Sequence, residues 1–359
     1  MTGNFYVPPI NEEVERKKAD KKAMSACFSR CGFGMLTLIG ATMAISFGLS
    51  LVMVILELLA QAEILKLDIM TYFNKYLLYI NEVLIAAAVG LGALVMLKMP
   101  KEAPEKRNLP LKSFLVMICV CCAIASAGNF IGNLWVEFWS LPFGGAGEDT
   151  VSAMLDGMDP LQIIICTGIL APIIEELFFR KMLIDRMYKY GEAITIFTTA
   201  LLFGLFHQNF GQFFYTFGIG LVLGYLYCRT GSYVRVVALH MVFNLLLGVI
   251  PALLSMEIYP FLEMMENVLF EEMASVLPEL LGKYGVPLAL FAVYMLLRSV
   301  LEVIGLVFAI LKFKKIELRK REPVLSTADQ LYASFVNPGM IAACSVLCSL
   351  LLFSLIPLG

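Results

Sequence analysis

Long uninterrupted apolar runs constrain this chain more than any other feature of its sequence. A membrane-spanning helix needs roughly 20 apolar residues, and nine runs come near or exceed that length: 33–60, 77–98, 112–134, 160–183, 193–208, 211–229, 234–254, 285–313 and 338–358. Hydrophobic residues make up 60% of the 359-residue chain, against about 45–50% in soluble domains. The sequence therefore predicts an all-α, polytopic transmembrane helix bundle with eight to nine membrane helices, and excludes soluble, disordered and secreted disulfide-rich classes.

The positions of the positive charges predict how the bundle is oriented. Alternate connections hold 23 of the 27 Lys and Arg residues, namely 1–32, 98–112, 180–192, 229–235 and 312–337. Cytoplasmic loops of membrane proteins carry such an excess, so we expect a cytoplasmic N-terminus and an external C-terminus. The formal net charge of −2 gives no reason to expect a nucleic-acid partner.

The same pattern divides the chain into segments with different expected roles. We expect a cytoplasmic N-terminal segment at 1–32, N-terminal transmembrane helices over 33–134, a catalytic core over 160–254 and C-terminal transmembrane helices over 285–359. Residues 255–283 combine six glutamates with large apolar residues, a pattern typical of an external amphipathic segment lying on the membrane surface. The acidic connection 135–159 is also expected to be external, with Trp135 and Trp139 at the interface.

Ionisable side chains inside the apolar runs are few, and they point to the functional region. Each costs at least roughly 2.5 kcal/mol at the centre of a membrane, so each needs a partner or a function. Arg298 and Glu302 lie one helical turn apart and are expected to form a structural pair. The full set contains both histidines of the chain: Glu57, Glu82, Glu175, Glu176, Arg180, His207, His240, Arg298 and Glu302.

The spacing of these residues predicts which of them share a helix face. Glu176 and Arg180 are four residues apart and can pair, whereas Glu175 projects about 100° away from Glu176 and stays free to take a proton. His240 and Asn244 are also four apart. His207 reaches the same depth only if the uncharged connection that follows it stays inside the membrane, lining a protein cavity.

Two kinds of chemistry suit this set of residues. A carboxylate in an apolar cavity can act as a general base, with one histidine positioning water and a histidine–asparagine pair stabilising an oxyanion; together these groups would hydrolyse an amide bond. Alternatively, Glu175, His207 and His240 could be zinc ligands that leave one position open for water. The H-E-x-x-H motif of the common zinc proteases is absent.

Three motifs in this region resemble a known family. Glu-Glu-x-x-x-Arg, Phe-x-x-x-His and His-x-x-x-Asn follow one another on successive predicted helices within residues 160–254. In this order they resemble the CAAX protease and bacteriocin-processing (CPBP, or Abi) family, which includes the type II CAAX prenyl endopeptidases. The resemblance implies an all-helical intramembrane endopeptidase with a cavity open toward the cytoplasm.

The resemblance also implies roles for individual residues. Glu175 would activate water with the help of His207, and His240 and Asn244 would stabilise the oxyanion. Glu176 and Arg180 would support them. The family has been described both as metal-dependent and as glutamate proteases. We favour the mechanism that requires no cofactor, with zinc as the alternative.

The preferred hypothesis is thus an endopeptidase of the membrane, with a lipidated or transmembrane peptide or protein as substrate and membrane lipids as its surroundings. A bacterial plasma membrane is expected, because family members are numerous there. One alternative is a non-catalytic immunity or scaffold protein of the same family. A proton-coupled transporter is a further alternative, although the matching pairs of broken helices typical of many transporters are not evident in the sequence.

Overall fold

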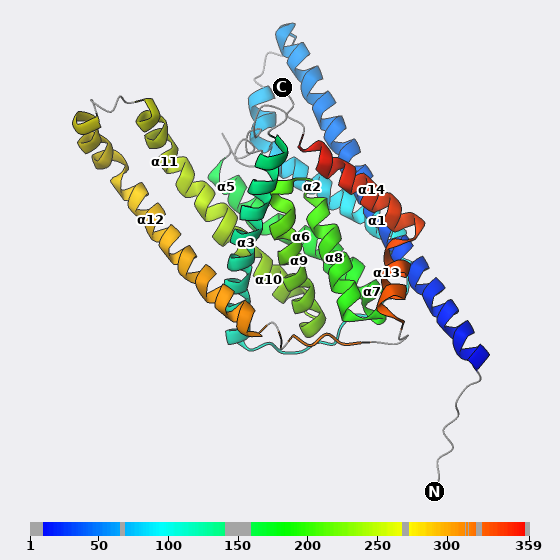
Figure 1. Ribbon diagram of the computed structural model, residues 1–359. Coiled ribbons are helices and arrows are strands. Elements are labelled where there is room, and N and C mark those ends of the chain that lie inside the picture. The colour runs from blue at the N-terminus through cyan, green and yellow to red at the C-terminus, as the bar shows by residue number, and fades with distance from the viewer. Residues whose placement is uncertain are drawn as a thin grey trace.

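The chain folds into a bundle of helices (Figure 1), seen here in a computed structural model that describes residues 10–64, 69–140, 159–267, 273–312, 314, 316–320 and 325–355. These residues contain no strand, so the predicted all-α class is confirmed. The helices are α1 (Ile10–Gln61), α2 (Ile69–Met96), α3 (Leu111–Ser140), α5 (Pro160–Gln162), η2 (Ile163–Leu170), α6 (Ala171–Glu176), η3 (Leu177–Ile184), α7 (Asp185–Met187), η4 (Tyr188–Tyr190), α8 (Glu192–Phe206), α9 (Phe210–Thr230), α10 (Tyr233–Asn244), η5 (Leu245–Val249), α11 (Ile250–Asn267), α12 (Met273–Lys312), α13 (Thr327–Phe335) and α14 (Pro338–Phe353).

The structure has seven or eight candidate membrane spans among the described residues, whereas the sequence predicted eight to nine. Within the described residues seven helices are long and apolar enough to cross a membrane, and α13 with α14, bent by 72°, makes an eighth if the pair is one span. The ninth predicted span fails because α8 has only 15 residues, about 22 Å of helix. The hydrocarbon core is about 30 Å thick, so α8 is too short to cross it.

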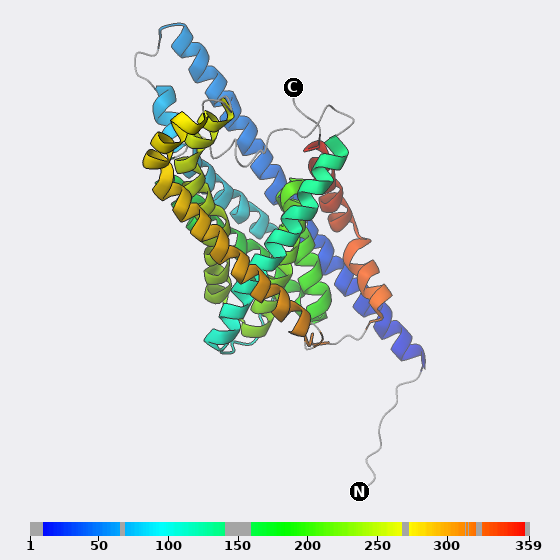
Figure 2. The ribbon, with the colours of Figure 1, turned by 60° about the vertical axis from the view of Figure 1, so that its left-hand side comes forward.

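The helices form a packed centre with other helices around it. In Figures 1 and 2, α6, α8, α9 and α10 occupy the middle of the bundle. The long α1 packs against α2, α13 and α14, while α3 packs against α9 and α12. The paired helices α11 and α12 stand away from the centre at the upper end of Figure 1. The motif-bearing helices are therefore the ones most enclosed by protein.

Two of the expected segments are helical and continuous with apolar helices. In the N-terminal segment, α1 runs without interruption from residue 10 through the first apolar run. Residues 255–267 continue α11, and α12 begins at Met273, so this part of the expected surface segment is helix continuous with the flanking spans. Residues 268–272, and 141–158 of the acidic connection, lie outside the described residues.

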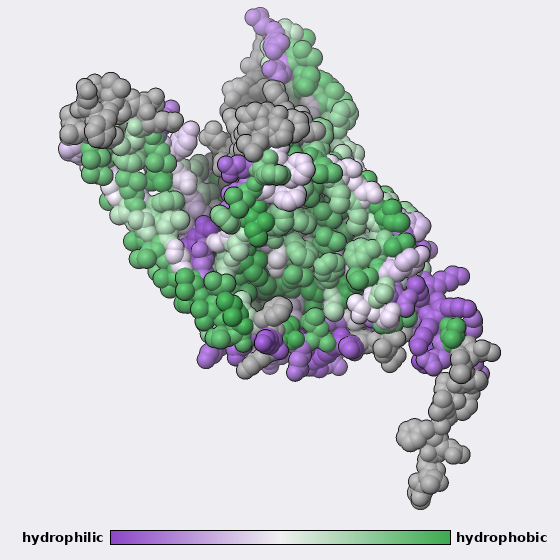
Figure 3. Space-filling view, viewed as in Figure 1, coloured by the Kyte–Doolittle hydropathy of each residue, from purple (hydrophilic) through white to green (hydrophobic). Residues whose placement is uncertain are grey.

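The surface agrees with a membrane environment. Figure 3 shows a broad apolar belt, with hydrophilic residues gathered along the lower edge of the bundle. Large apolar side chains of α12 are exposed along its length, including Val286 (72%), Leu296 (66%) and Ile310 (67%). Because water would oppose such exposure and lipid would not, the chain is an integral membrane protein. Its orientation remains a prediction.

The expected structural pair of α12 is present and confirmed. Arg298 Nε donates to Glu302 Oε1 at 2.6 Å. Ser126 of α3 completes the group, since its hydroxyl donates to Glu302 at 2.5 Å and accepts from Arg298 Nη2 at 3.0 Å. The pair therefore fastens α12 to α3 inside the apolar belt.

Candidate active site

The two neighbouring carboxylates lie on a helix whose hydrogen-bond register changes twice. Glu175 and Glu176 end the short α6, which lies between the π-helical turns η2 and η3. Pro172 has no N–H and cannot serve as the donor five residues after Thr167. The Thr167 carbonyl instead accepts from the Asn244 side chain at 2.8 Å. Widened π turns are frequent at functional sites, and here one of them ties α6 to the end of α10.

A fully buried ion pair lies at the centre of the site, as the spacing predicted. Arg180 Nε lies 2.8 Å from Glu176 Oε2, and both side chains have no exposed surface. The other carboxylate oxygen of Glu176 lies 2.9 Å from His240 Nδ1. The guanidinium of Arg180 lies over the ring of Phe203, 5.1 Å from its centroid. Glu176 therefore links the arginine to the histidine.

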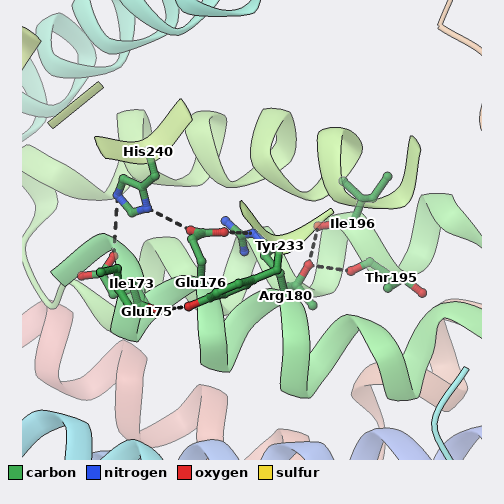
Figure 4. Close-up of polar contacts among 9 residues, drawn as sticks. Ile173, Glu175, Glu176, Arg180, Thr195, Ile196, Tyr233 and His240 are labelled. Atoms are coloured by element: carbon green, nitrogen blue, oxygen red, sulfur yellow. Dashed lines mark hydrogen bonds and ion pairs between the residues drawn. The ribbon is translucent and has the colours of Figure 1, made fainter. Parts of the chain in front are cut away.

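Glu175 is the less restrained of the two carboxylates. Figure 4 shows the His240 ring between them, with one ring nitrogen facing each. Glu175 Oε2 lies 3.8 Å from His240 Nε2, beyond hydrogen-bond distance, and its side chain is 20% exposed. It lines a cavity of about 50 Å³ whose other walls are mostly apolar. This carboxylate is thus held only by the long contact with His240 and not by a hydrogen bond among the described residues.

The other histidine, His207, follows the last residue of α8 and joins the site through an aromatic side chain. Its Nδ1 lies 2.8 Å from the Phe203 carbonyl, and because that oxygen can only accept, Nδ1 carries a proton. The Phe203 ring contacts both histidines, with centroids 4.9 Å from His207 and 5.9 Å from His240. Phe203 therefore lies between the two histidines of the chain.

The chain reverses directly after His207. Gln208 takes a left-handed conformation (φ 53°), which turns the chain directly after the short α8. Asn209 then caps α9, accepting a hydrogen bond from Gly211 N at 2.7 Å. The reversal occurs beside the protein core, with Phe210 only 9% exposed, and its depth in the membrane stays a prediction.

Asn244 lies at the end of α10, one turn beyond His240, and is half-buried. Its Nδ2 donates to the Thr167 carbonyl, and an amide nitrogen carries two protons. One N–H is thus used to position the side chain. The second N–H remains available in principle for a substrate oxygen.

The predicted zinc ligands were tested for fit. Among the described residues, no three His, Cys, Asp or Glu side chains are grouped so that they could hold a metal ion. Glu175 and His240 face each other, but one nitrogen of His240 is engaged with Glu176. The donor set among the described residues therefore does not fit a three-ligand zinc site.

Two residues of the site received no role from the sequence. Glu82 of α2 is only 8% exposed and lines the same cavity as Glu175. Its signal was visible as an isolated carboxylate in an apolar run, but sequence spacing could not show which helix it faces. Tyr233, whose hydroxyl donates to the Ile173 carbonyl at 2.7 Å, had no recognisable signal.

Comparisons with known proteins agree with the motifs. Residues 157–246 match the family described as Type II CAAX prenyl endopeptidase Rce1-like. The chain is 26% identical over 157 residues to the "Putative membrane peptidase YdiL" of Bacillus subtilis (strain 168), which covers 42% of this chain and 62% of that protein. The aligned region therefore spans less than two thirds of this relative. No solved structure matches. The resemblance to the CAAX protease family is confirmed.

Proposed function

We propose that this chain is an intramembrane endopeptidase, because residues 157–246 match the family described as Type II CAAX prenyl endopeptidase Rce1-like. It hydrolyses a peptide bond in a lipidated or membrane-embedded peptide or protein. A bacterial plasma membrane is the proposed location, which the Bacillus subtilis relative supports. The observation that carries the proposal is the buried series Arg180–Glu176–His240, which ends opposite the less restrained carboxylate of Glu175.

The buried pair acts on catalysis by orienting His240. Glu176 accepts a hydrogen bond from the Nδ1–H of His240 and so directs Nε2 toward Glu175, much as a buried carboxylate orients a catalytic histidine in other hydrolases. The carboxylates of Glu175 and Glu176 each face one ring nitrogen of His240. The ring can therefore donate from Nδ1 to Glu176 and from Nε2 into the gap in front of Glu175.

The attacking water is assigned to the gap between Glu175 and His240. Glu175 Oε2 and His240 Nε2 are 3.8 Å apart. A water molecule beside this gap can therefore lie about 2.8 Å from both atoms, which is a normal hydrogen-bond distance. Glu175 is then close enough to take the proton. His207 has its Nδ1 proton engaged with a backbone carbonyl, so its neutral form presents Nε2 as an acceptor that orients the same water.

The reaction follows from these positions. Water oxygen bonds to the scissile carbonyl carbon as Glu175 takes its proton, and the carbonyl oxygen becomes an oxyanion. The Nε2–H of His240 and the second amide N–H of Asn244 stabilise that charge. The C–N bond then breaks as protonated Glu175 returns its proton to the leaving nitrogen, which restores the carboxylate.

Glu82 is proposed to influence the charge of the cavity. Two like charges in a small, mostly apolar cavity repel strongly. A proton held by Glu82 would relieve this repulsion and leave Glu175 ionised as the base. Glu82 is therefore a positioning residue, acting through Glu175, not a group that touches the substrate.

The proposal is tested with the purified full chain reconstituted in liposomes with a pool of membrane-anchored peptides. We expect the wild type to cleave members of the pool, with and without a zinc chelator, and Glu175→Gln to cleave none. Cleavage by Glu175→Gln would contradict the assigned base. Loss of activity on chelation, with recovery on adding zinc, would contradict the metal-free mechanism.

A further inference from the structure

A second pocket lies apart from the catalytic cavity, where three spans begin or end. It encloses about 470 Å³ between the segment that precedes α3 and the turn from α9 to α10. This is the end of the bundle at which the hydrophilic residues gather in Figure 3. The residues that line it are Lys106, Arg107, Asn108, Lys181, Thr230, Gly231, Ser232, Tyr233, Val234 and Arg235.

The lining of this pocket is positively charged. It includes four cationic side chains and no carboxylate. Two of the cations are paired with acids outside the lining, Arg107 with Glu105 at 2.5 Å and Lys181 with Asp185 at 2.7 Å. Lys106 and Arg235 have no carboxylate within ion-pair distance among the described residues. The pocket therefore holds an excess of positive charge.

The walls of the pocket are fixed by the fold. Arg235 donates to the Arg107 carbonyl and, at 2.9 Å, to the side chain of Asn108. Arg107 N donates to the Thr230 carbonyl at 2.9 Å. Gly231 has a positive φ of 55°, and a Cβ there would collide with the backbone of Pro104. A pocket held in this way needs little reorganisation to bind a ligand.

Apolar surface lies beside the charges. Val234 in the pocket wall is 74% exposed, and Leu111 at the start of α3 is 72% exposed. The start of α10 is capped by Ser232, whose hydroxyl accepts from the Arg235 N–H at 3.4 Å. Cations next to exposed apolar side chains, at the edge of a membrane, match a phosphate linked to acyl chains.

We propose that this pocket binds the phosphate group of an anionic phospholipid. Lys106 and Arg235 supply the unpaired positive charge, and Val234 contacts the start of the acyl chains. One wall residue, Tyr233, donates to the Ile173 carbonyl, two residues before Glu175. The bound headgroup thus lies one hydrogen bond away from the helix that carries the catalytic carboxylates.

The test measures lipid binding and does not depend on protease activity. The purified full chain in a neutral detergent is titrated with short-chain phosphatidylglycerol or phosphatidylcholine, and the bound lipid is counted by native mass spectrometry. We expect phosphatidylglycerol to bind more tightly. Lys106→Gln and Arg235→Gln should each weaken its binding about five-fold, and the double variant more than either.

The control is the double variant Lys312→Gln, Lys320→Gln. It removes two positive charges from the same end of the bundle but outside the pocket, so its affinity for phosphatidylglycerol should equal that of the wild type. Lys106 is exposed and makes no contact that the fold needs, so Lys106→Glu gives a second test if Arg235→Gln fails to fold. Equal binding of both lipids, or wild-type affinity in Lys106→Glu, would overturn the proposal.

Two further arms identify the source of the anion. The first experiment adds inorganic phosphate, with chloride at equal ionic strength as the control. If the acyl chains contribute to binding, phosphate should displace phosphatidylglycerol only weakly. Complete displacement would point to a free phosphate ligand and overturn the lipid assignment.

The second experiment tests a peptide as the occupant, by comparing an apolar peptide that has a free C-terminal carboxylate with the same peptide as its amide. Binding of the acid form alone, with no preference for phosphatidylglycerol, would also overturn the lipid assignment.

Discussion

Two arginine–glutamate pairs with the same four-residue spacing lie inside the apolar part of this protein, and only one belongs to the candidate active site. Arg298 and Glu302 are about one quarter exposed, and Ser126 completes their hydrogen bonds. Arg180 and Glu176 are fully buried, and both terminal nitrogens of Arg180 lack a hydrogen-bond partner among the described residues. The first pair forms hydrogen bonds only within the group that it makes with Ser126. The second pair also contacts His240 through Glu176, and His240 in turn faces Glu175.

The difference shows what the same local pattern can do in different surroundings. A buried polar atom without a partner costs about 1–3 kcal/mol, so the central pair is poorly suited to stabilise the fold. In the proposed mechanism the pair holds His240 in one orientation. The peripheral pair instead joins α12 to α3. Spacing alone therefore does not separate a structural pair from a catalytic support.

The largest expected effect on the cleavage rate is that of Glu175→Gln at the candidate active site, compared with the same change at the peripheral pair. Glu175→Gln should lower cleavage by at least about 10²–10⁴-fold, the usual contribution of general base catalysis, because Gln cannot take the proton of water. Glu302→Gln should leave the rate near wild type. The rates are measured with purified variants on one membrane-anchored peptide. Similar losses in both variants would remove the distinction between the pairs.

His207→Ala should likewise abolish cleavage while the protein still folds and inserts. The water would lose the ring nitrogen that orients it, and no ion pair would be broken. Folding is checked by thermal unfolding monitored by circular dichroism. Retained cleavage would show that His207 does not belong to the catalytic group.

Removing each arginine should distinguish the pairs by stability. Arg180→Met leaves Glu176 buried without its counter-charge and should cost about 3–5 kcal/mol. Arg298→Met should cost less, because Glu302 keeps Ser126 and some exposure. Denaturant unfolding in a detergent micelle measures both. An equal or larger loss for Arg298→Met would contradict the assigned difference in burial cost.

Asn244→Ala should lower turnover by roughly 10²–10³-fold, the usual loss for one oxyanion donor. Ser126→Ala is the matched change at the peripheral pair and should leave turnover unchanged. Because Asn244 also donates to Thr167, a stability measurement accompanies the rate. An unchanged rate in Asn244→Ala would remove this residue from the oxyanion site.

The smallest expected effect belongs to Glu82. Glu82→Gln keeps the shape of the cavity and removes only its ability to exchange a proton, so turnover should fall less than in Glu175→Gln, with stability preserved. Kinetics and thermal unfolding of the same preparation provide the check. A loss as large as that of Glu175→Gln would make Glu82 the base and contradict the assigned roles.

The sequence predicted most of the fold and one pairing within the candidate site, for identifiable reasons. Apolar runs set the helices, and four-residue spacing predicted the pairing of Glu176 with Arg180, since both depend on local geometry. The positions of Glu82 and Tyr233 depend on contacts between helices distant in the sequence, which spacing does not encode. The continuous helix over 10–61 was also missed, because charge marks the membrane boundary but does not end a helix.

The central claim is that Glu175 activates water in a working protease. The most direct measurement compares peptide termini in membranes from cells that express the wild type or Glu175→Gln at equal levels. We predict new termini that appear only with the wild type, and these termini would identify its substrates. Identical profiles across growth conditions would contradict the claim and favour a non-catalytic immunity or scaffold role.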